Sequence, residues 1–251
     1  MQITGNTILI TGGNSGIGRG LAEALHQAGN HVIIAGRNQQ SLDETTAANP
    51  GMASFVFDVA DEGSIRPFAE RITTDYPALN VLINNAGIMR AENLLSQPEE
   101  LEDMEATITT NLLGPLRLTA ALLPHLQRQP QATIINVSSG LAFVPLAHTP
   151  TYCATKAAIH SYTQSLRFQL RDTNTQVIEL VPPAVATELM PGASKNPHAM
   201  PLDAFIAESM ELLKNNPTAT EICVEQVKFL RNAAERNQFD TVFNTLNQRR
   251  S

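Results

Sequence analysis

Two side chains able to exchange a proton stand four positions apart in the stretch 149–172. A helix over this stretch places Tyr152 and Lys156 on one face, one turn apart. A free phenol keeps its proton up to a pH of about 10, and a neighbouring ammonium group favours the phenolate. We therefore expect Lys156 to lower the Tyr152 pKa, so that Tyr152 can act as a general acid or base. Taken alone, the pair also fits a half-buried helix face.

A second chemical signal is the glycine-rich sequence TGGNSGIG at residues 11–18. Gly12, Gly16 and Gly18 permit a tight turn in which main-chain N–H groups approach a diphosphate. The turn follows an apolar run and precedes a helical pattern, so the amino-terminal end of that helix would face the anion. The alternative is a purely structural strand-to-helix turn.

The end of the second apolar run indicates which dinucleotide would bind. An acidic residue there would bind a ribose 2′-hydroxyl, whereas an arginine suits a 2′-phosphate. This chain has Gly36 followed by Arg37, with no carboxylate to repel a phosphate. The sequence therefore favours NADP over NAD, although Arg37 could instead be an ordinary exposed side chain.

Short apolar runs alternate regularly with helical patterns along the first 180 residues. This alternation predicts an α/β fold with a parallel sheet covered on both faces, formed by one domain over residues 1–251. The six predicted strands lie at 7–11, 31–35, 52–57, 81–84, 132–138 and 176–181. The predicted helices include 98–126, with a bend at Gly114 and Pro115, and the stretch that carries Tyr152.

After Pro183 the pattern loosens into a loop that we interpret as a substrate lid at about 188–206. Helices are expected at 202–215 and 220–236. Phe239, Val242, Phe243 and Leu246 stand at helical spacing, so the carboxyl-terminal tail should be helical too.

Composition excludes several classes of protein. The net charge of −7 argues against a nucleic-acid surface, and the two cysteines suggest no disulfide framework. The sequence contains no run of about eighteen apolar residues, so no membrane span is predicted, and the first residues do not resemble a signal peptide. A cytoplasmic protein is therefore expected. The six histidines show no metal-binding spacing, so no metal site is predicted.

Taken together, the motifs resemble those of the short-chain dehydrogenase/reductase family, and finer details resemble its DltE-type branch. The resemblance runs from residue 6 to residue 188 and includes TGGNSGIG, the NNAG sequence at 84–87, and Ser139 thirteen residues before Tyr152. It implies a catalytic tetrad of Asn111, Ser139, Tyr152 and Lys156. It also implies a set of cofactor-binding residues: Gly12, Asn14, Ser15, Gly16, Ile17, Gly18, Arg37, Asp58, Val59, Asn85, Ala86, Gly87, Tyr152, Lys156, Pro182, Val185 and Thr187.

The chain departs from the family pattern at two places. Pro183 stands where the family usually has glycine, which would stiffen the loop that carries Thr187. The glycine-rich seventh strand of many members is not recognisable, so we expect six strands and no oligomer contact along a seventh. The resemblance further implies a homodimer formed through the long helices around Asn111 and Tyr152.

The resemblance implies an NADP-dependent oxidoreductase that transfers a hydride between nicotinamide and a carbonyl or alcohol substrate. Ser139 would hold the substrate oxygen, Tyr152 would exchange its proton, and Asn111 would support a water chain. The apolar loop 140–149 and the predicted lid suggest a substrate with apolar bulk. Two alternatives remain: a non-catalytic, redox-sensing regulator that binds NAD(P) on the same fold, and a related epimerase or dehydratase.

Overall fold

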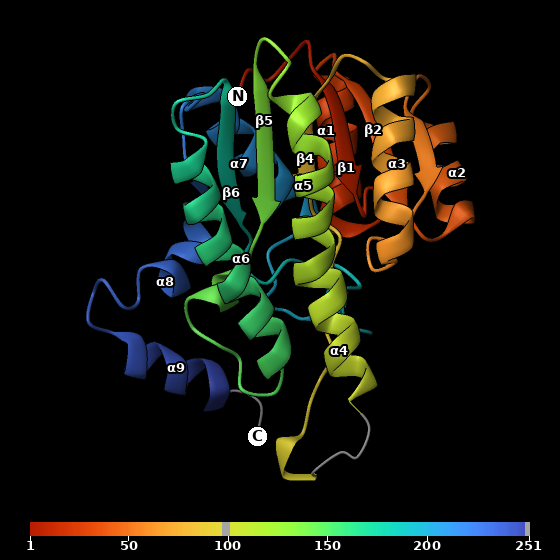
Figure 1. Ribbon diagram of the computed structural model, residues 1–251. Coiled ribbons are helices and arrows are strands. Elements are labelled where there is room, and N and C mark those ends of the chain that lie inside the picture. The colour runs from red at the N-terminus through yellow and green to blue at the C-terminus, as the bar shows by residue number, and fades with distance from the viewer. Residues whose placement is uncertain (97–100, 249–251) are drawn as a thin grey trace.

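Seven parallel strands form a single sheet in the computed structural model, which describes residues 1–96 and 101–248 (Figure 1). The strands follow the order β3-β2-β1-β4-β5-β6-β7. Their bounds are β1 (Thr7–Thr11), β2 (His31–Gly36), β3 (Ala53–Val56), β4 (Leu79–Asn84), β5 (Ala132–Val137), β6 (Thr175–Val181) and β7 (Glu221–Cys223). The predicted α/β fold with a doubly wound parallel sheet is confirmed.

Helices cover both faces of the sheet, which explains why the strands are apolar almost throughout. Ile8 and Ile10 of β1 belong to the hydrophobic cluster on one face, whereas Leu9 between them belongs to the cluster on the other. The first cluster includes residues of α1 (Gly16–Gln27), α2 (Gln39–Ala48) and α7 (Leu202–Asn215). The second includes residues of α3 (Glu62–Asp75), α5 (Gly114–Leu126) and α6 (Pro150–Gln169).

The expectation of six strands is wrong by one. Residues predicted to begin a helix at 220 instead form β7, where Ile222 pairs in parallel register with Leu180 of β6. Ile222 is buried, and the main-chain N–H of Glu179 donates to the oxygen of Thr220 at 3.0 Å. A three-residue strand is too short for its periodicity to be recognised, and pairing with β6 outweighs the local helical pattern. We expected no oligomer contact along a seventh strand because we recognised no such strand, and the presence of β7 removes that reason.

The long helical stretch before β5 is interrupted earlier than predicted. It consists of α4 (Glu102–Ile108), a π-helical turn (Thr109–Leu113) and α5, while its predicted start at Pro98 lies outside the described residues. A Cβ on Gly114 would lie 2.6 Å from the carbonyl oxygen of Val59, so this glycine lets the helix approach the end of β3. Such π turns occur most often at functional sites, and this one contains Asn111.

The last part of the chain folds against the carboxyl edge of the sheet. It contains α8 (Lys228–Arg231) and α9 (Phe239–Gln248), so the prediction of a helical tail is confirmed. Figure 1 shows α9 beyond the ends of the strands, near the amino-terminal end of α6. Across the described ranges, none of the helices combines the length and apolar character needed to cross a membrane.

Candidate active site

The glycine-rich turn connects β1 to α1 and depends on two of its glycines for its shape. Gly12 and Gly16 have φ angles of +65° and +49°, a region that side chains disfavour. A Cβ on Gly18 would lie 2.1 Å from the carbonyl oxygen of Gly12, so no larger residue fits where the helix crosses the turn. The turn can therefore place main-chain groups where a side chain would otherwise stand.

The amino-terminal end of α1 is open for an anion. Its N-cap residue, Ser15, makes no side-chain hydrogen bond to the helix, so the first N–H groups of α1 have no side-chain cap. These groups and the positive end of the helix dipole suit the binding of a phosphate.

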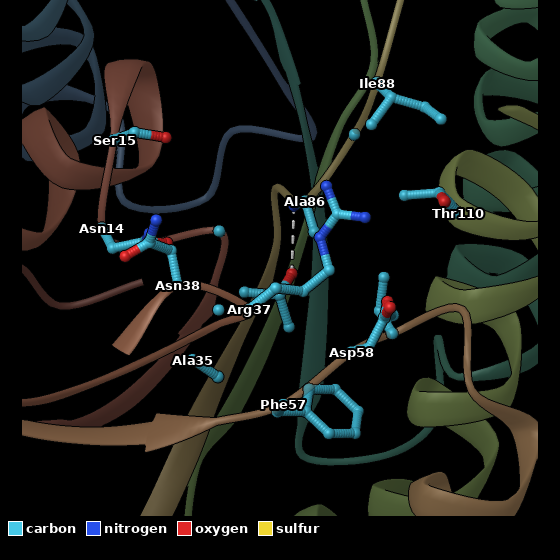
Figure 2. Close-up of a pocket in the computed structure, with 15 residues that line it drawn as sticks. Asn14, Ser15, Ala35, Arg37, Asn38, Phe57, Asp58, Ala86, Ile88 and Thr110 are labelled. Atoms are coloured by element: carbon cyan, nitrogen blue, oxygen red, sulfur yellow. Dashed lines mark hydrogen bonds between the residues drawn. The ribbon is translucent and has the colours of Figure 1, made fainter. Parts of the chain in front are cut away.

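A cavity of about 180 Å³ opens beside this turn, at the carboxyl ends of β1, β2 and β4 (Figure 2). Eight of the predicted cofactor-binding residues line it: Gly12, Asn14, Ser15, Arg37, Asp58, Val59, Ala86 and Gly87. Sequence reasoning missed seven more: Thr11, Ala35, Gly36, Asn38, Phe57, Ile88 and Thr110. Most of the missed residues are direct neighbours of predicted ones, so the motifs themselves marked these positions.

The charged groups of the cavity come from the ends of β2 and β3. Figure 2 shows Arg37 extending its guanidinium group into the cavity, which Asp58 also lines. Asp58 Oδ1 accepts a hydrogen bond from the N–H of Ala60 at 2.9 Å, whereas Arg37 has no ion-pair partner among the described residues. A Cβ on Gly36 would lie 2.2 Å from Asn14 Oδ1, so a larger residue there would displace the Asn14 side chain.

Other predicted cofactor-binding residues lie outside this cavity and support its walls. Asn85 Nδ2 donates to the carbonyl oxygens of Thr11 and Gly12, which ties the end of β4 to the glycine turn. Ile17 packs against the core cluster of α1. Thr187 reaches the turn from the loop after β6, since its Cγ2 lies 3.4 Å from the position of a Cβ on Gly16.

Pro182 and Val185 hold the start of that loop. The carbonyl oxygen of Pro182 accepts from the N–H of Gly140 at 2.8 Å, and Val185 pairs with Met200. Met200 is buried in the core, and Leu202 packs against it. Met200 and Leu202 of the predicted lid therefore face the core, whereas Leu189 in the same segment is 40% exposed.

The hydroxyl groups of Ser139 and Tyr152 meet near the carboxyl end of β5. Both side chains are buried, and the Ser139 hydroxyl lies near enough to the phenol to lower its pKa. Lys156, one turn along α6, places its Nζ 5.6 Å from the centre of the Tyr152 ring and donates to the carbonyl oxygen of Val137 at 2.8 Å. The structure thus brings the predicted phenol, ammonium and alcohol together.

Burial controls the ionisation of this pair. It raises the pKa of Tyr152 above its usual value, and the nearby Ser139 hydroxyl offsets this only in part. It also lowers the pKa of Lys156 to about 8. The expectation that Lys156 lowers the Tyr152 pKa is therefore wrong for this arrangement, in which the ammonium group binds Val137 rather than the phenol oxygen.

The Asn111 side chain connects two segments of the chain through hydrogen bonds. Its Oδ1 accepts from the N–H of Ile88 at 2.8 Å, and its Nδ2 donates to the oxygen of Ile88 at 2.8 Å and to Thr155 Oγ1 at 3.3 Å. Thr155 in turn donates to the carbonyl oxygen of Tyr152 at 2.7 Å. The π turn thus links the segment after β4 to the helix that carries the tyrosine.

Glu92 is a further residue of the site that sequence reasoning missed. Its carboxylate accepts from the N–H of Thr151 at 3.0 Å and from Thr151 Oγ1 at 2.7 Å, next to Tyr152. No local pattern marks this contact, because the two residues are 59 positions apart. In the described part of the chain, no group of three or more His, Cys, Asp or Glu side chains could hold a metal ion.

Comparisons with known proteins agree with this geometry. A family model described as short chain dehydrogenase matches residues 6–198. An uncharacterized oxidoreductase of Bacillus subtilis, DltE, is 41% identical over 251 residues, covering 98% of both chains. An uncharacterized oxidoreductase of Staphylococcus epidermidis is 32% identical over 73% of this chain and 80% of its own.

A solved structure also matches nearly the whole chain. It is a short chain dehydrogenase from Burkholderia cenocepacia in complex with NADP, with a TM-score of 0.81 and 25% identity, covering 97% of this chain and 99% of its own. The range that the family model matches contains the glycine turn, Ser139, Tyr152 and Lys156 of this chain. The chain therefore belongs to the short-chain dehydrogenase family.

Proposed function

We propose that this protein is an NADP-dependent oxidoreductase that transfers a hydride between nicotinamide and a carbonyl or alcohol substrate. The observation that carries the proposal is that the buried side chains of Ser139 and Tyr152 lie together, with a buried Lys156 one helical turn from the tyrosine. Members of this family act on small molecules, and the pair lies at the sheet edge where α/β folds bind such ligands.

The residues around the glycine turn fit a dinucleotide. Gly12, Gly16 and the uncapped end of α1 would bind the diphosphate, and Asp58 would bind the adenine amino group. Lys156 would bind the nicotinamide ribose, and Thr187 the carboxamide. When bound, the cofactor would donate or accept the hydride.

Arg37 is the reason for preferring NADP. Its guanidinium group lines the cavity without an ion-pair partner among the described residues, so it is available for a 2′-phosphate. The similar Burkholderia cenocepacia protein, which is in complex with NADP, supports the same choice.

The proposed chemistry uses the protonation states that burial favours. Because the Tyr152 pKa is raised, the phenol keeps its proton at neutral pH and can donate it to a carbonyl oxygen. Ser139 would hold that oxygen beside the phenol. Lys156, with a pKa of about 8, is mostly protonated at neutral pH, so its ammonium group would be available to bind the nicotinamide ribose. Asn111 would keep α6 in position through Thr155, and its expected water chain stays a prediction.

The second candidate is a non-catalytic regulator that binds the same dinucleotide on the same fold. It would need neither the Ser139 hydroxyl nor the Tyr152 hydroxyl, yet both are present and buried. Turnover of NADPH with a panel of aldehydes and ketones distinguishes an enzyme from a regulator.

The direct test is the substitution Tyr152→Phe, which removes the transferable proton and little else. We expect it to lower kcat by at least about a hundredfold, in the range of general acid–base catalysis. NADPH affinity, measured by fluorescence titration, and the melting temperature should stay close to those of the wild type. Full activity in the variant would refute the assignment of Tyr152.

A further inference from the structure

The carboxyl-terminal helix α9 reaches the surroundings of Tyr152 from about ninety residues further along the chain. Leu246 packs against the buried cluster of Leu146, Tyr152 and Cys153. The same leucine packs against a second cluster, which includes Val144 of the loop after Ser139 and Val242 of α9. Leu246 therefore connects the tail helix to the loop beside the reacting hydroxyl groups.

Polar contacts fix α9 on that loop. Asn247 Oδ1 accepts from the N–H of Ala147 at 2.6 Å, and its Nδ2 donates to the carbonyl oxygen of Pro145 at 3.2 Å. A third hydrogen bond, from Nδ2 to the oxygen of Phe243 at 2.8 Å, orients the amide within its own helix. One side chain thus binds two main-chain groups of the loop and keeps α9 in register with it.

The loop that α9 holds is continuous with the catalytic serine. The N–H of Leu141 donates to Ser139 Oγ at 3.1 Å, and Leu141 packs against the Tyr152 cluster. Three apolar side chains, those of Met89, Leu141 and Leu246, are only partly buried against this cluster. They leave apolar surface exposed beside the phenol, as the wall of a substrate site requires.

We propose that α9 forms one wall of the substrate site, with Leu246 setting the size of the apolar group accepted beside Tyr152 and Asn247 acting as its positioning residue. This inference rests on the proposed function and specifies its substrate class as carbonyl compounds with an apolar substituent. It adds a second source of apolar contacts to the predicted lid at 188–206, of which Met200 and Leu202 pack in the core while Leu189 is 40% exposed.

The test changes the volume at position 246 in both directions. We expect Leu246→Ala to raise the kcat/KM of hexanal relative to propanal about tenfold, and Leu246→Phe to lower the same ratio. One or two methylene groups in an apolar pocket change kcat/KM by about that factor. A loss of stability would not shift this ratio in opposite directions in the two variants. Asn244→Ala is the matched control, because Asn244 is exposed on the same helix.

The same protein preparations test Asn247. Asn247→Ala should raise the KM for hexanal several-fold while the NADPH dissociation constant stays unchanged, because the cofactor cavity is lined by other parts of the chain. A purely structural role would instead affect both constants or neither.

Binding of carboxamides provides a readout that does not depend on turnover. Hexanamide and propanamide carry a carbonyl oxygen but are not substrates for reduction, and calorimetry with NADP present measures their affinity ratio. The ratio should shift with residue 246 as the aldehyde ratio does. If neither ratio responds to position 246, the inference is overturned, whether or not Tyr152→Phe loses activity.

Discussion

The proposed preference for NADP depends on Arg37. It follows Gly36 at the end of β2, and the Asp58 carboxylate in the same cavity already accepts a hydrogen bond from the main chain. We expect Arg37→Ala to weaken NADPH binding about tenfold to a hundredfold, the value of a hydrogen bond to a charged group, and to leave NADH binding nearly unchanged. Fluorescence titration with both nucleotides measures the difference. An equal loss for both would show that Arg37 does not read the 2′-phosphate.

Lys156 makes the stability of the protein depend on pH. Burial lowers its pKa from 10.5 to about 8, so between these values the unfolded chain binds a proton that the folded protein does not. Below pH 8 the buried lysine therefore lowers the free energy of unfolding by about 3 kcal/mol. This loss of stability disappears as the pH rises toward 10.5.

The variant Lys156→Met isolates this effect, because all other groups titrate in both proteins. In urea unfolding without cofactor, the wild type should gain about 2 kcal/mol relative to the variant between pH 7 and pH 10. A difference that stays constant with pH would mean that Lys156 is solvated in the folded protein.

At the scale of elements, α6 is held in place by residues that lie far from it in the sequence. Its first turn begins at Pro150, and the side chain of its N-cap residue Thr149 does not cap a main-chain N–H of the helix. Glu92 supplies the missing acceptor, with its negative charge near the positive end of the helix. Asn111 of the π turn holds the same helix through Thr155. Tyr152 is therefore positioned by two segments, the one after β4 that contains Glu92 and the π turn after α4.

The elements that could be predicted from the sequence are those whose signal is local. The strand runs, the glycine turn and the periodicity of Phe239, Val242 and Leu246 each lie within a few residues, and the structure confirms the elements they predict. The strand β7 was missed because it depends on its pairing with β6. The contact of Glu92 with Thr151 and that of Asn247 with Ala147 were missed for the same reason, since each joins residues more than fifty positions apart.

At the scale of the molecule, the site lies where the sheet changes its direction of growth. From β1 the chain adds β2 and β3 on one side, and it then returns to add β4 to β7 on the other. The glycine turn after β1 and the segment after β4 line the cavity at this point, and α6 brings Tyr152 to the same edge. The topology alone therefore places the glycine turn and Tyr152 at the same edge of the sheet.

The helices on one face of this sheet also present apolar surface that a second copy of the chain would cover. Phe168 of α6 is 67% exposed, and Ile108 and Leu113 on either side of Asn111 are partly exposed. We propose a homodimer in which these helices pack against their counterparts, as the family resemblance implies.

Light scattering should then give about twice the chain mass of 27.2 kDa. Phe168→Asp should weaken association at least about thirtyfold, because a buried, unpaired carboxylate costs 2 kcal/mol or more. Phe229→Asp is the matched control, since Phe229 is a similarly exposed phenylalanine on α8. A wild type that is monomeric at micromolar concentration rejects the dimer, and equal dissociation of both variants rejects the proposed interface.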